Sequence, residues 1–587
     1  MGAICGWINK NENLTNRQEL FKEMLNTMNY RGNTCPGFHF DEHILLGNNR
    51  LLIRDSEKGN QPMQYKDYII IYNGEIFNTE EIKNKLIQKN YEFDTNCDTE
   101  IILKGYAEYK EQILDLLEGF FAFCIYNTKD EELFLARDRF GIKPLYYCNK
   151  NNNFIFSSTI KPILKSKIIK PCLNKDSLGE ILALGPSKKQ GSGIFNDINE
   201  LRSAHYLKLK DEKIEIKRYW NLETKECNDT FDEAKEKVKN LLIDSIKRQM
   251  TSDVEIATLL SGGLDSSLVT AIVAKNKKEQ LTTFSIDYEG NDKYFNKNDF
   301  TVSLDEHYIN IMKNEFSTKH EYKTITQEDL VKYLKIALYA KDYPGMADVD
   351  ASLLWFSKEI SKEFNVILSG EGADEIFGGY PWFYRDELNN RNFFPWINNI
   401  EYRQNLLNEN IKDKINLKQI IENEYNKTIN ELPKEDRNDK YKVLFYINMT
   451  HFAQCLLERK DRMTMYSSVE ARVPFVDTKL IEYLWNLPFE YKYSNNTEKY
   501  LLREAFKGVI PDEILYRKKN PYPKTHNPQF LNAVTNLLSE RLKNKNSKMY
   551  KIFNIDKINE LLESKDDNML PWYRSAYDQT SAYSLFI

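Results

Sequence analysis

Short apolar runs alternate with polar turns over residues 3–209, which is the pattern expected of β-strands. Strand candidates lie at 43–46, 68–72, 120–126, 133–136 and 154–157, and two stretches, 17–28 and 99–108, have helical spacing. We therefore predict a mixed α+β domain over 1–209, built from layers of antiparallel strands and helices.

The pattern changes after a polar segment, 210–230, which we predict to be a linker. Thr230 and Glu233 have the spacing of a capping box in front of an amphipathic helix. Strand-like runs at 254–260, 281–286 and 365–368 then alternate with helices, which is the order of a parallel α/β sheet. We predict a second domain over 231–587, mostly helical from about residue 380, with ligands at the carboxyl ends of its strands.

The strand at 254–260 runs into the turn Ser261-Gly262-Gly263-Leu264-Asp265-Ser266. At such a strand-to-helix corner, backbone N–H groups and the positive end of the helix dipole attract phosphate. Two glycines let the backbone approach closely, and a carboxylate beside phosphate indicates Mg²⁺. The turn lacks the lysine of a Walker-type loop and matches the loop of enzymes that release pyrophosphate and form adenylates. A turn without chemical meaning is the alternative.

A second glycine turn, 369–380, follows the strand at 365–368 and is rich in carboxylates. At the end of a neighbouring parallel strand it would face the first turn across bound ATP. Asp374 could then share Mg²⁺ with Asp265, and Glu371 could act as a base or position the nucleophile. Because a helix start favours carboxylates in any case, a solvated helix N-terminus is the alternative.

A third cluster, 517–524, is basic and rich in proline and tyrosine. A lysine held on such a rigid loop would suit a transition-state phosphate. Taken alone, the run is more typical of a solvated face.

Composition and charge exclude several classes. The formal net charge is −5 with both signs interspersed, so we expect no nucleic-acid-binding surface. The eight cysteines form no C-x-x-C pair, which favours a reducing cytoplasm and no zinc site. No apolar run reaches ~18 residues, so we expect a cytoplasmic protein without a membrane span.

Together these motifs resemble the asparagine synthetase B family of the glutamine-hydrolysing type, over nearly the whole chain. The segments 72–78, 136–147 and 469–475 add to the resemblance. It implies an N-terminal nucleophile hydrolase-like glutaminase domain, a four-layer sandwich, followed by an α/β synthetase domain of the PP-loop type. It also implies that ATP activates a carboxylate, aspartate in the parent family, as an acyl-adenylate that ammonia attacks.

The resemblance also assigns site residues. It implies that Glu371 assists the nucleophile, that Lys519 stabilises the charge formed during adenylation, and that Mg²⁺ binds Asp265 and Asp374. The residues implied to bind ATP and pyrophosphate are Leu260, Ser261, Gly262, Gly263, Asp265, Ser266, Ile286, Ser369 and Gly370. Those matching the glutamine pocket are Gly2, Arg50, Asn73, Gly74, Glu75 and Asp98, with Asn73 and Gly74 as the oxyanion hole.

The family's nucleophilic cysteine directly follows the initiator methionine, where this chain has Gly2. Loss of a nucleophile costs a factor of about 10⁶ in a serine protease, so we expect no glutamine hydrolysis. Removal of residues 1–4 would expose Cys5, but gapless spacing to Arg31 favours Cys5 as a small buried hydrophobe. Asn33-Thr34 stands where the family has Pro-Asp, which weakens the pocket further.

Three functions remain open. The first is an amide ligase that takes a small carboxylate substrate and free ammonia, and the surviving glutamine pocket favours it. The second is a cyclase acting on a precursor peptide or small molecule, because lasso peptide cyclases and β-lactam synthetase resemble the family and also lack the cysteine. The third is an inactive scaffold, which the intact carboxylates and Lys519 argue against. A homodimer is compatible with each.

Overall fold

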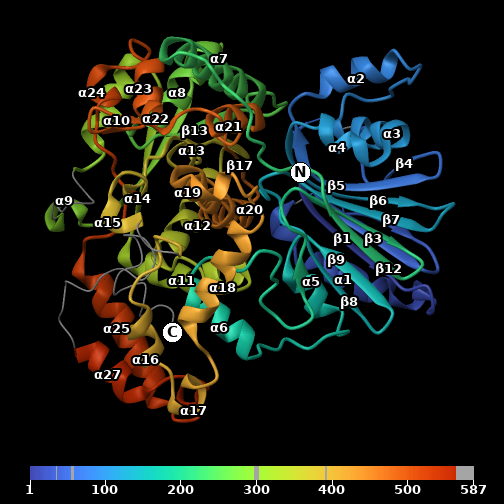
Figure 1. The fold of residues 1–587 in the computed structure, drawn as a ribbon. Coiled ribbons are helices and arrows are strands. Elements are labelled where there is room, and N and C mark those ends of the chain that lie inside the picture. Colours follow the sequence, from blue (N-terminus) through green and yellow to red (C-terminus); the bar gives the residue numbers. More distant parts are fainter. Residues whose placement is uncertain (33, 35, 55–57, 296–302, 390–392, 564–587) are drawn as a thin grey trace.

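The computed structural model describes residues 1–32, 34, 36–54, 58–295, 303–389 and 393–563. Two six-stranded antiparallel sheets build its N-terminal half, drawn mainly in blue and teal in Figure 1. The sheet of order β10-β8-β9-β1-β3-β2 contains β1 (Gly2–Ile8), β2 (Gly37–Phe40), β3 (Ile44–Arg50), β8 (Tyr146–Lys150), β9 (Asn153–Ser157) and β10 (Asn199–Glu200). The sheet of order β12-β11-β7-β6-β5-β4 contains β4 (Met63–Tyr65), β5 (Tyr68–Ile76), β6 (Gly119–Asn127), β7 (Glu132–Arg137), β11 (His205–Lys210) and β12 (Lys213–Arg218).

Apolar side chains hold the two sheets together. Successive side chains of a strand point to opposite faces, so each strand supplies two different cores. Ile4 of one sheet and Leu135 of the other belong to a buried cluster that both sheets share. The other face of each sheet packs against helices, namely α1 (Gln18–Asn26) and α5 (Ile160–Lys165) on the first sheet, and α2 (Thr79–Ile87) and α3 (Asp98–Tyr109) on the second.

The strand candidates of this half coincide with β3, β5, β6, β7 and β9, and the two helical stretches with α1 and α3. The prediction of only two helical stretches is wrong, because α2, α5 and α6 (Lys175–Leu184) also form. In α2, Ile82 and Leu86 are the only buried apolar residues, so its apolar stripe is too short to recognise. Strand β12 lies inside the predicted linker 210–230 and pairs with β11.

A five-stranded parallel sheet of order β15-β14-β13-β16-β17 forms the centre of the C-terminal half and confirms the predicted α/β organisation. Its outer strands escaped prediction because β15 is rich in charged residues and β17 is only three residues long. Among the described residues, the chain beyond 380 is mostly helical, as predicted, and no helix is long and apolar enough to cross a membrane. The strands are β13 (Ile256–Leu259), β14 (Thr282–Tyr288), β15 (Lys319–Ile325), β16 (Val366–Leu368) and β17 (Glu470–Arg472).

The strand order creates one switch point. From β13 the chain continues outward to β14 and β15, and then returns to place β16 on the other side of β13. Open α/β sheets bind ligands at such a point, beyond the carboxyl ends of the two strands. Helix α8 (Leu264–Asn276) begins after β13 and α13 (Ala373–Phe377) after β16, so both glycine turns lie at this edge.

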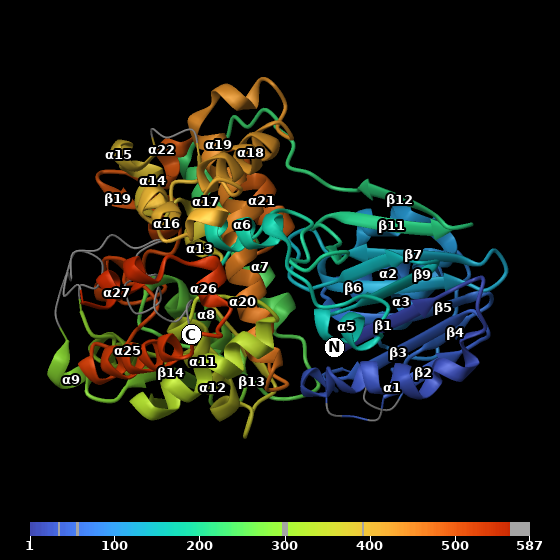
Figure 2. The ribbon, with the colours of Figure 1, turned by 90° about the horizontal axis from the view of Figure 1, so that it is seen from below.

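Helix α20 (Ala453–Met465) of the C-terminal half makes contacts with the N-terminal half, and Figure 2 shows it beside that half. The Asp461 carboxylate lies 2.8 Å from Nη1 of Arg31 and 3.2 Å from Nζ of Lys143. The hydroxyl of Tyr146 donates a hydrogen bond of 2.8 Å to Glu458. Since these groups are buried, the contact between the halves depends on matched charges rather than on apolar packing alone.

We expect Asp461→Asn to lower the free energy of unfolding by about 3–5 kcal/mol, because it leaves two buried cations without a carboxylate. Urea unfolding followed by circular dichroism measures the loss. As a control, Glu19→Gln removes a partner from the exposed pair with Lys22 and should leave the midpoint unchanged. An Asp461→Asn midpoint equal to that of the parent would contradict the structural role of this cluster.

Candidate active site

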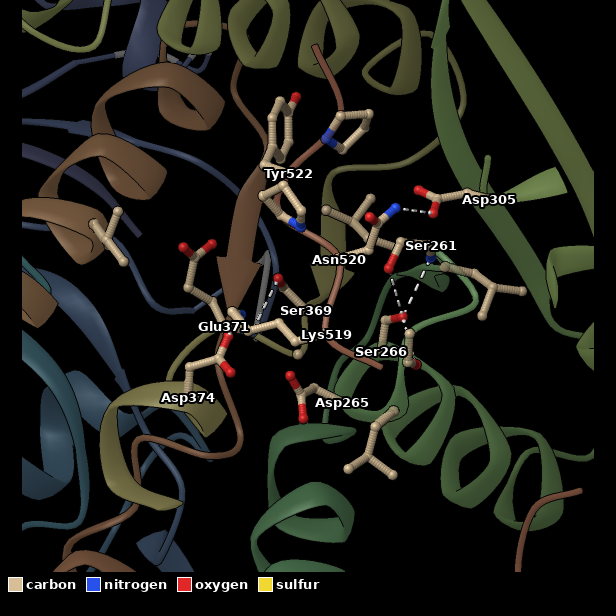
Figure 3. A pocket seen from close by; sticks show the side chains of 18 of the residues that line it. Ser261, Asp265, Ser266, Asp305, Ser369, Glu371, Asp374, Lys519, Asn520 and Tyr522 are labelled. Atoms are coloured by element: carbon tan, nitrogen blue, oxygen red, sulfur yellow. Dashed lines mark hydrogen bonds and ion pairs between the residues drawn. The ribbon is translucent and has the colours of Figure 1, made fainter. Parts of the chain in front are cut away.

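A cavity of about 230 Å³ opens at the switch point (Figure 3). Both glycine turns line it, and the loop after α24 (Asp512–Leu515) adds Lys519. The predicted residues that line the cavity are Leu260, Ser261, Gly263, Asp265, Ser266, Ile286, Ser369, Gly370, Glu371, Asp374 and Lys519. The structure thus brings three motifs that are distant in the sequence to a single cavity.

Gly262 is the exception among the predicted ATP-binding residues, because it does not line this cavity. Its φ is +66°, and a Cβ there would lie 2.6 Å from Cβ of Tyr308. Gly262 therefore serves the turn itself, by adopting left-handed backbone and allowing close contact with α10 (Glu306–Glu315).

The first turn presents its polar groups to the cavity. Ser266 Oγ accepts a hydrogen bond of 3.2 Å from the backbone N–H of Ser261 and lies 3.1 Å from Ser261 Oγ (Figure 3). Gly263 caps α8 with extended backbone, so the N–H groups of the first helical turn remain available. This is the arrangement that binds a phosphate group at a helix N-terminus.

A lysine that sequence reasoning missed holds the two predicted metal ligands together. Nζ of Lys499 lies 2.6 Å from Oδ2 of Asp265 and 2.7 Å from Oδ1 of Asp374. Lys519 also pairs with Asp374. No motif marks Lys499, which sits in an ordinary charged segment before α23 (Tyr500–Ala505) and adopts a φ of +54° that the sequence does not reveal.

The charges of this cluster are strongly coupled. Burial acts to raise the pKa of Asp374, but the ammonium groups of Lys499 and Lys519 hold it well below its usual range. Burial raises the pKa of Asp265, against the pull of Lys499. Burial, and then the charge of Asp374, raises the pKa of the neighbouring Glu375 to about 7. Asp374 is therefore the carboxylate whose negative charge is most firmly maintained.

The donor set fits a metal ion that also binds phosphate. Oδ1 of Asp265 is buried and makes no hydrogen bond to any described residue. No group of three or more histidines, cysteines, aspartates or glutamates suitable for a metal occurs in the described part of the chain. A cation held by two carboxylates and completed by substrate phosphates needs no larger protein cluster.

Glu371 lies on the side of the cavity opposite the first turn, above Asp374 in the view of Figure 3. Nζ of Lys460, on α20, is 2.7 Å from its Oε2. Lys460 also escaped sequence reasoning, because it stands in a run of charged residues typical of an exposed helix face. The ion pair holds the side chain of Glu371 at the cavity wall.

The residues that match a glutamine pocket also come together, around the N-terminus. The N–H of Gly2 donates 3.0 Å to Oδ1 of Asn73, and Arg50 lies opposite Gly2 in the β1–β3 register. Tyr72 donates 2.7 Å to Asp98. Nδ2 of Asn73 is buried without a partner among the described residues.

Two further residues of this pocket are held by their neighbours. Gly74 follows Asn73 on β5, and a Cβ on it would lie 2.3 Å from the carbonyl oxygen of Phe120. Glu75 pairs with Arg54 at 2.8 Å, and burial, followed by the charge of Asp98, raises the Glu75 pKa to about 7. Polar side chains therefore still line the part of the structure that matches a glutamine pocket.

The backbone at Gly2, and not only the absence of a thiol, differs from what a cysteine at this position would need. Its φ is +144°, and a Cβ would lie 1.9 Å from the carbonyl oxygen of Asn49. Cys5 lies in the middle of β1, fully buried, and burial raises the pKa of its thiol. Exposing Cys5 would therefore dismantle a paired strand. Thr34 donates 2.5 Å to the carbonyl of Arg50, whereas Asn33 lies outside the described residues.

Comparison with known proteins agrees with this geometry. The Asparagine synthase family model matches residues 237–584, and the Glutamine amidotransferase domain model matches residues 1–220. The chain is 43% identical over 586 residues to "Asparagine synthetase (glutamine-hydrolyzing) 3" of Bacillus subtilis (strain 168), covering 98% of this chain and 95% of the relative. It is 31% identical over 563 residues to "Asparagine synthetase (glutamine-hydrolyzing) 1" of the same strain, covering 89% and 87%.

The first family model spans more than half of the chain, and the 43% identity extends over nearly all of it. The serine turn, the paired carboxylates Asp265 and Asp374, and two lysines meet at one cavity. The chain belongs to the asparagine synthase family and is an ATP-dependent carbon–nitrogen ligase.

Proposed function

We propose that this chain makes asparagine from aspartate, ATP and free ammonia. Aspartate would attack the α-phosphorus of ATP to form β-aspartyl-AMP and pyrophosphate, and ammonia would then displace AMP. The observation that carries this proposal is the convergence of the serine turn, Asp265, Asp374 and Lys519 on one cavity. The names of the relatives, which are asparagine synthetases, support aspartate as the substrate.

Each part of the cavity then has a chemical task. Ser261, Ser266 and the N-terminus of α8 would bind the leaving pyrophosphate. Asp265 and Asp374 would hold Mg²⁺, which neutralises phosphate charge when it is bound. Lys499 would keep the two carboxylates at a fixed separation, since it lies within 2.7 Å of both.

The second half-reaction needs a nucleophile beside the adenylate. Glu371 is fixed at the cavity wall by Lys460, so it can accept a proton from ammonia as the new bond forms. Free ammonia is the nitrogen source that fits Gly2, because this position supplies no thiol to release nitrogen from glutamine and the described Cys5 is buried within β1. The relatives named above give no support to a cyclase or to an inactive scaffold.

We further propose two domains, 1–209 and 231–587, with β12 of the intervening segment joined to the sheet of the first. The family matches to 1–220 and 237–584 support this division. The helix layers on the outer face of each sheet support a four-layer arrangement of the first domain. Cytoplasmic location and a homodimer stay predictions.

The nucleotide products test the proposal. With aspartate and ammonium chloride, we expect AMP and pyrophosphate in equal amounts, each matching the asparagine formed. Phosphorus NMR of the reaction mixture distinguishes these products from ADP and phosphate. ADP as the product would contradict adenylation.

Lys519→Met should lower pyrophosphate release by about 100- to 1,000-fold, because one fixed charge is lost from the transition state. The KM for ATP should change far less, since the serine turn and the paired carboxylates remain. Lys507→Met, which alters an exposed lysine outside the cavity, is the matched control. A Lys519→Met enzyme with more than a tenth of the parent rate would exclude this role.

A further inference from the structure

Helix α20 carries five consecutive charged residues, 458–462, whose exposed fractions are all 7% or less. Such burial requires a partner for each charge. Glu458 and Asp461 are paired with the N-terminal half, as described above, and Arg462 pairs with Asp342. Arg459 and Lys460 instead line the ATP cavity. They therefore face the cavity rather than the domain contact.

Three other basic residues of the cavity, Lys499, Lys519 and Arg517, are engaged near the first glycine turn or Asp374. Lys499 and Lys519 contact Asp374. Arg517 donates 3.0 Å to the carbonyl of Ser261 and pairs with Asp305. These groups lie where pyrophosphate would leave.

Arg459 and Lys460 lie at the other end of the cavity. Lys460 pairs with Glu371, and the guanidinium of Arg459 is 4.8 Å from the ring centroid of Tyr522. In Figure 3, Glu371 and Tyr522 lie on the side away from Ser261 and Ser266. This end therefore offers two basic side chains, each balanced by a carboxylate, to an anionic group of the second substrate.

Arg459 is rigidly prepared for such a group. Its Nε donates 3.1 Å to Asp350 Oδ1 and its Nη2 donates 2.9 Å to the carbonyl of Val349, while it is 2% exposed. Asp350 does not line the cavity and neutralises Arg459 from behind. A guanidinium fixed in this way loses little entropy when it binds a carboxylate.

We propose that Arg459, together with Lys460, binds the carboxylate of the acyl substrate that does not react. The inference rests on the proposed function and narrows its substrate class to free amino acids with two carboxylates. A peptide side chain or a simple monocarboxylic acid lacks the group that this end of the cavity recognises. Arg459 is thus a specificity-determining residue, and Lys460 both contributes charge and positions Glu371.

The test compares aspartate with 3-aminopropanoate, which keeps the reacting carboxylate and the ammonium group but lacks the second carboxylate. In the parent enzyme, kcat/KM should favour aspartate by about 100-fold or more. In the double variant Arg459→Met/Asp350→Asn this preference should fall by about 10- to 150-fold. Asparagine at 350 avoids an unpaired buried carboxylate and still accepts from the N–H of Met346.

Two more variants separate recognition from stability. Arg459→Lys keeps the charge and should retain an intermediate preference. Tyr343→Phe removes a hydrogen bond to Glu458 on the other side of α20, outside the cavity, and should leave the preference unchanged. A purely structural role of Arg459 would lower kcat/KM for both substrates equally and leave the preference intact, and this result would overturn the inference.

Calorimetric titration of each substrate in the presence of a non-hydrolysable ATP analogue separates the inference from the proposed function. If aspartate binding depends on Arg459 but no pyrophosphate is released when ATP replaces the analogue, the subsite is supported and the proposed function is refuted. If pyrophosphate is released but the double variant keeps the preference for aspartate over 3-aminopropanoate, the proposed function is supported and the subsite is refuted. Equal binding of the two substrates to the parent protein would also overturn the inference.

Discussion

Replacing Asp265 with asparagine is expected to lower pyrophosphate release by about 1,000-fold or more. Asp265 supplies a buried Oδ1 without a hydrogen-bond partner among the described residues, and this atom is the one best placed for Mg²⁺. The amide of asparagine is a weaker metal ligand and also loses the charge that pairs with Lys499. Initial rates of pyrophosphate formation at saturating ATP, aspartate and ammonium measure the effect.

The matched control is Asp477→Asn. Asp477 is also buried and ion-paired, at 2.9 Å from Arg248, but it caps α21 (Thr478–Trp485) outside the cavity. The control should keep most of the activity, while both variants keep the circular dichroism of the parent. An Asp265→Asn enzyme within tenfold of the parent rate would contradict the assignment of this carboxylate.

Glutamine in place of ammonia is expected to give no glutamate and less than about 1/10,000 of the ammonia-dependent rate. The pocket keeps Asn73 and Asp98, yet no described side chain at the position of Gly2 can attack a carboxamide. The thiol of Cys5 does not replace it, because it is buried within β1 and its pKa is raised. Glutamate release measured with a coupled dehydrogenase checks the prediction.

Gly2→Cys makes this prediction more specific. A Cβ at this position would collide with the carbonyl oxygen of Asn49, so the variant must shift the start of β1 before its thiol can act. We therefore expect little glutaminase activity from Gly2→Cys and a lower unfolding midpoint. Ala3→Ser, one residue further along the strand, is the control for a small change in β1. Strong glutamine hydrolysis by the unmodified protein would overturn the account of this pocket.

The parts of the site that sequence analysis found are those where local chemistry is unusual. Gly263, Asp265 and the second glycine turn stand out because glycines, hydroxyls and carboxylates follow directly on apolar strands. The pairing of β13 with β16 could be expected from the alternation of strands and helices. The periodicity of the sequence therefore predicted the fold class. It also predicted that the two glycine turns lie at the carboxyl ends of neighbouring parallel strands.

The residues that sequence analysis missed depend on contacts between distant segments. Lys499 and Lys460 stand in charged runs that are typical of solvated helices, and only the fold buries them beside Asp374 and Glu371. Gly262 does not line the cavity, and its left-handed backbone and close contact with Tyr308 could not be expected from the sequence. Tertiary packing brings such lysines to the cavity, and no local sequence pattern predicts it.

The most direct test of the account follows the nitrogen atom. The protein is incubated with ATP, Mg²⁺ and aspartate, together with either ¹⁵N-ammonium or glutamine labelled with ¹⁵N in its amide. Mass spectrometry then measures the label in the product. We predict ¹⁵N-asparagine from ammonium, with AMP and pyrophosphate, and no labelled asparagine from glutamine. Label transferred from glutamine, or pyrophosphate release without asparagine, would contradict the account.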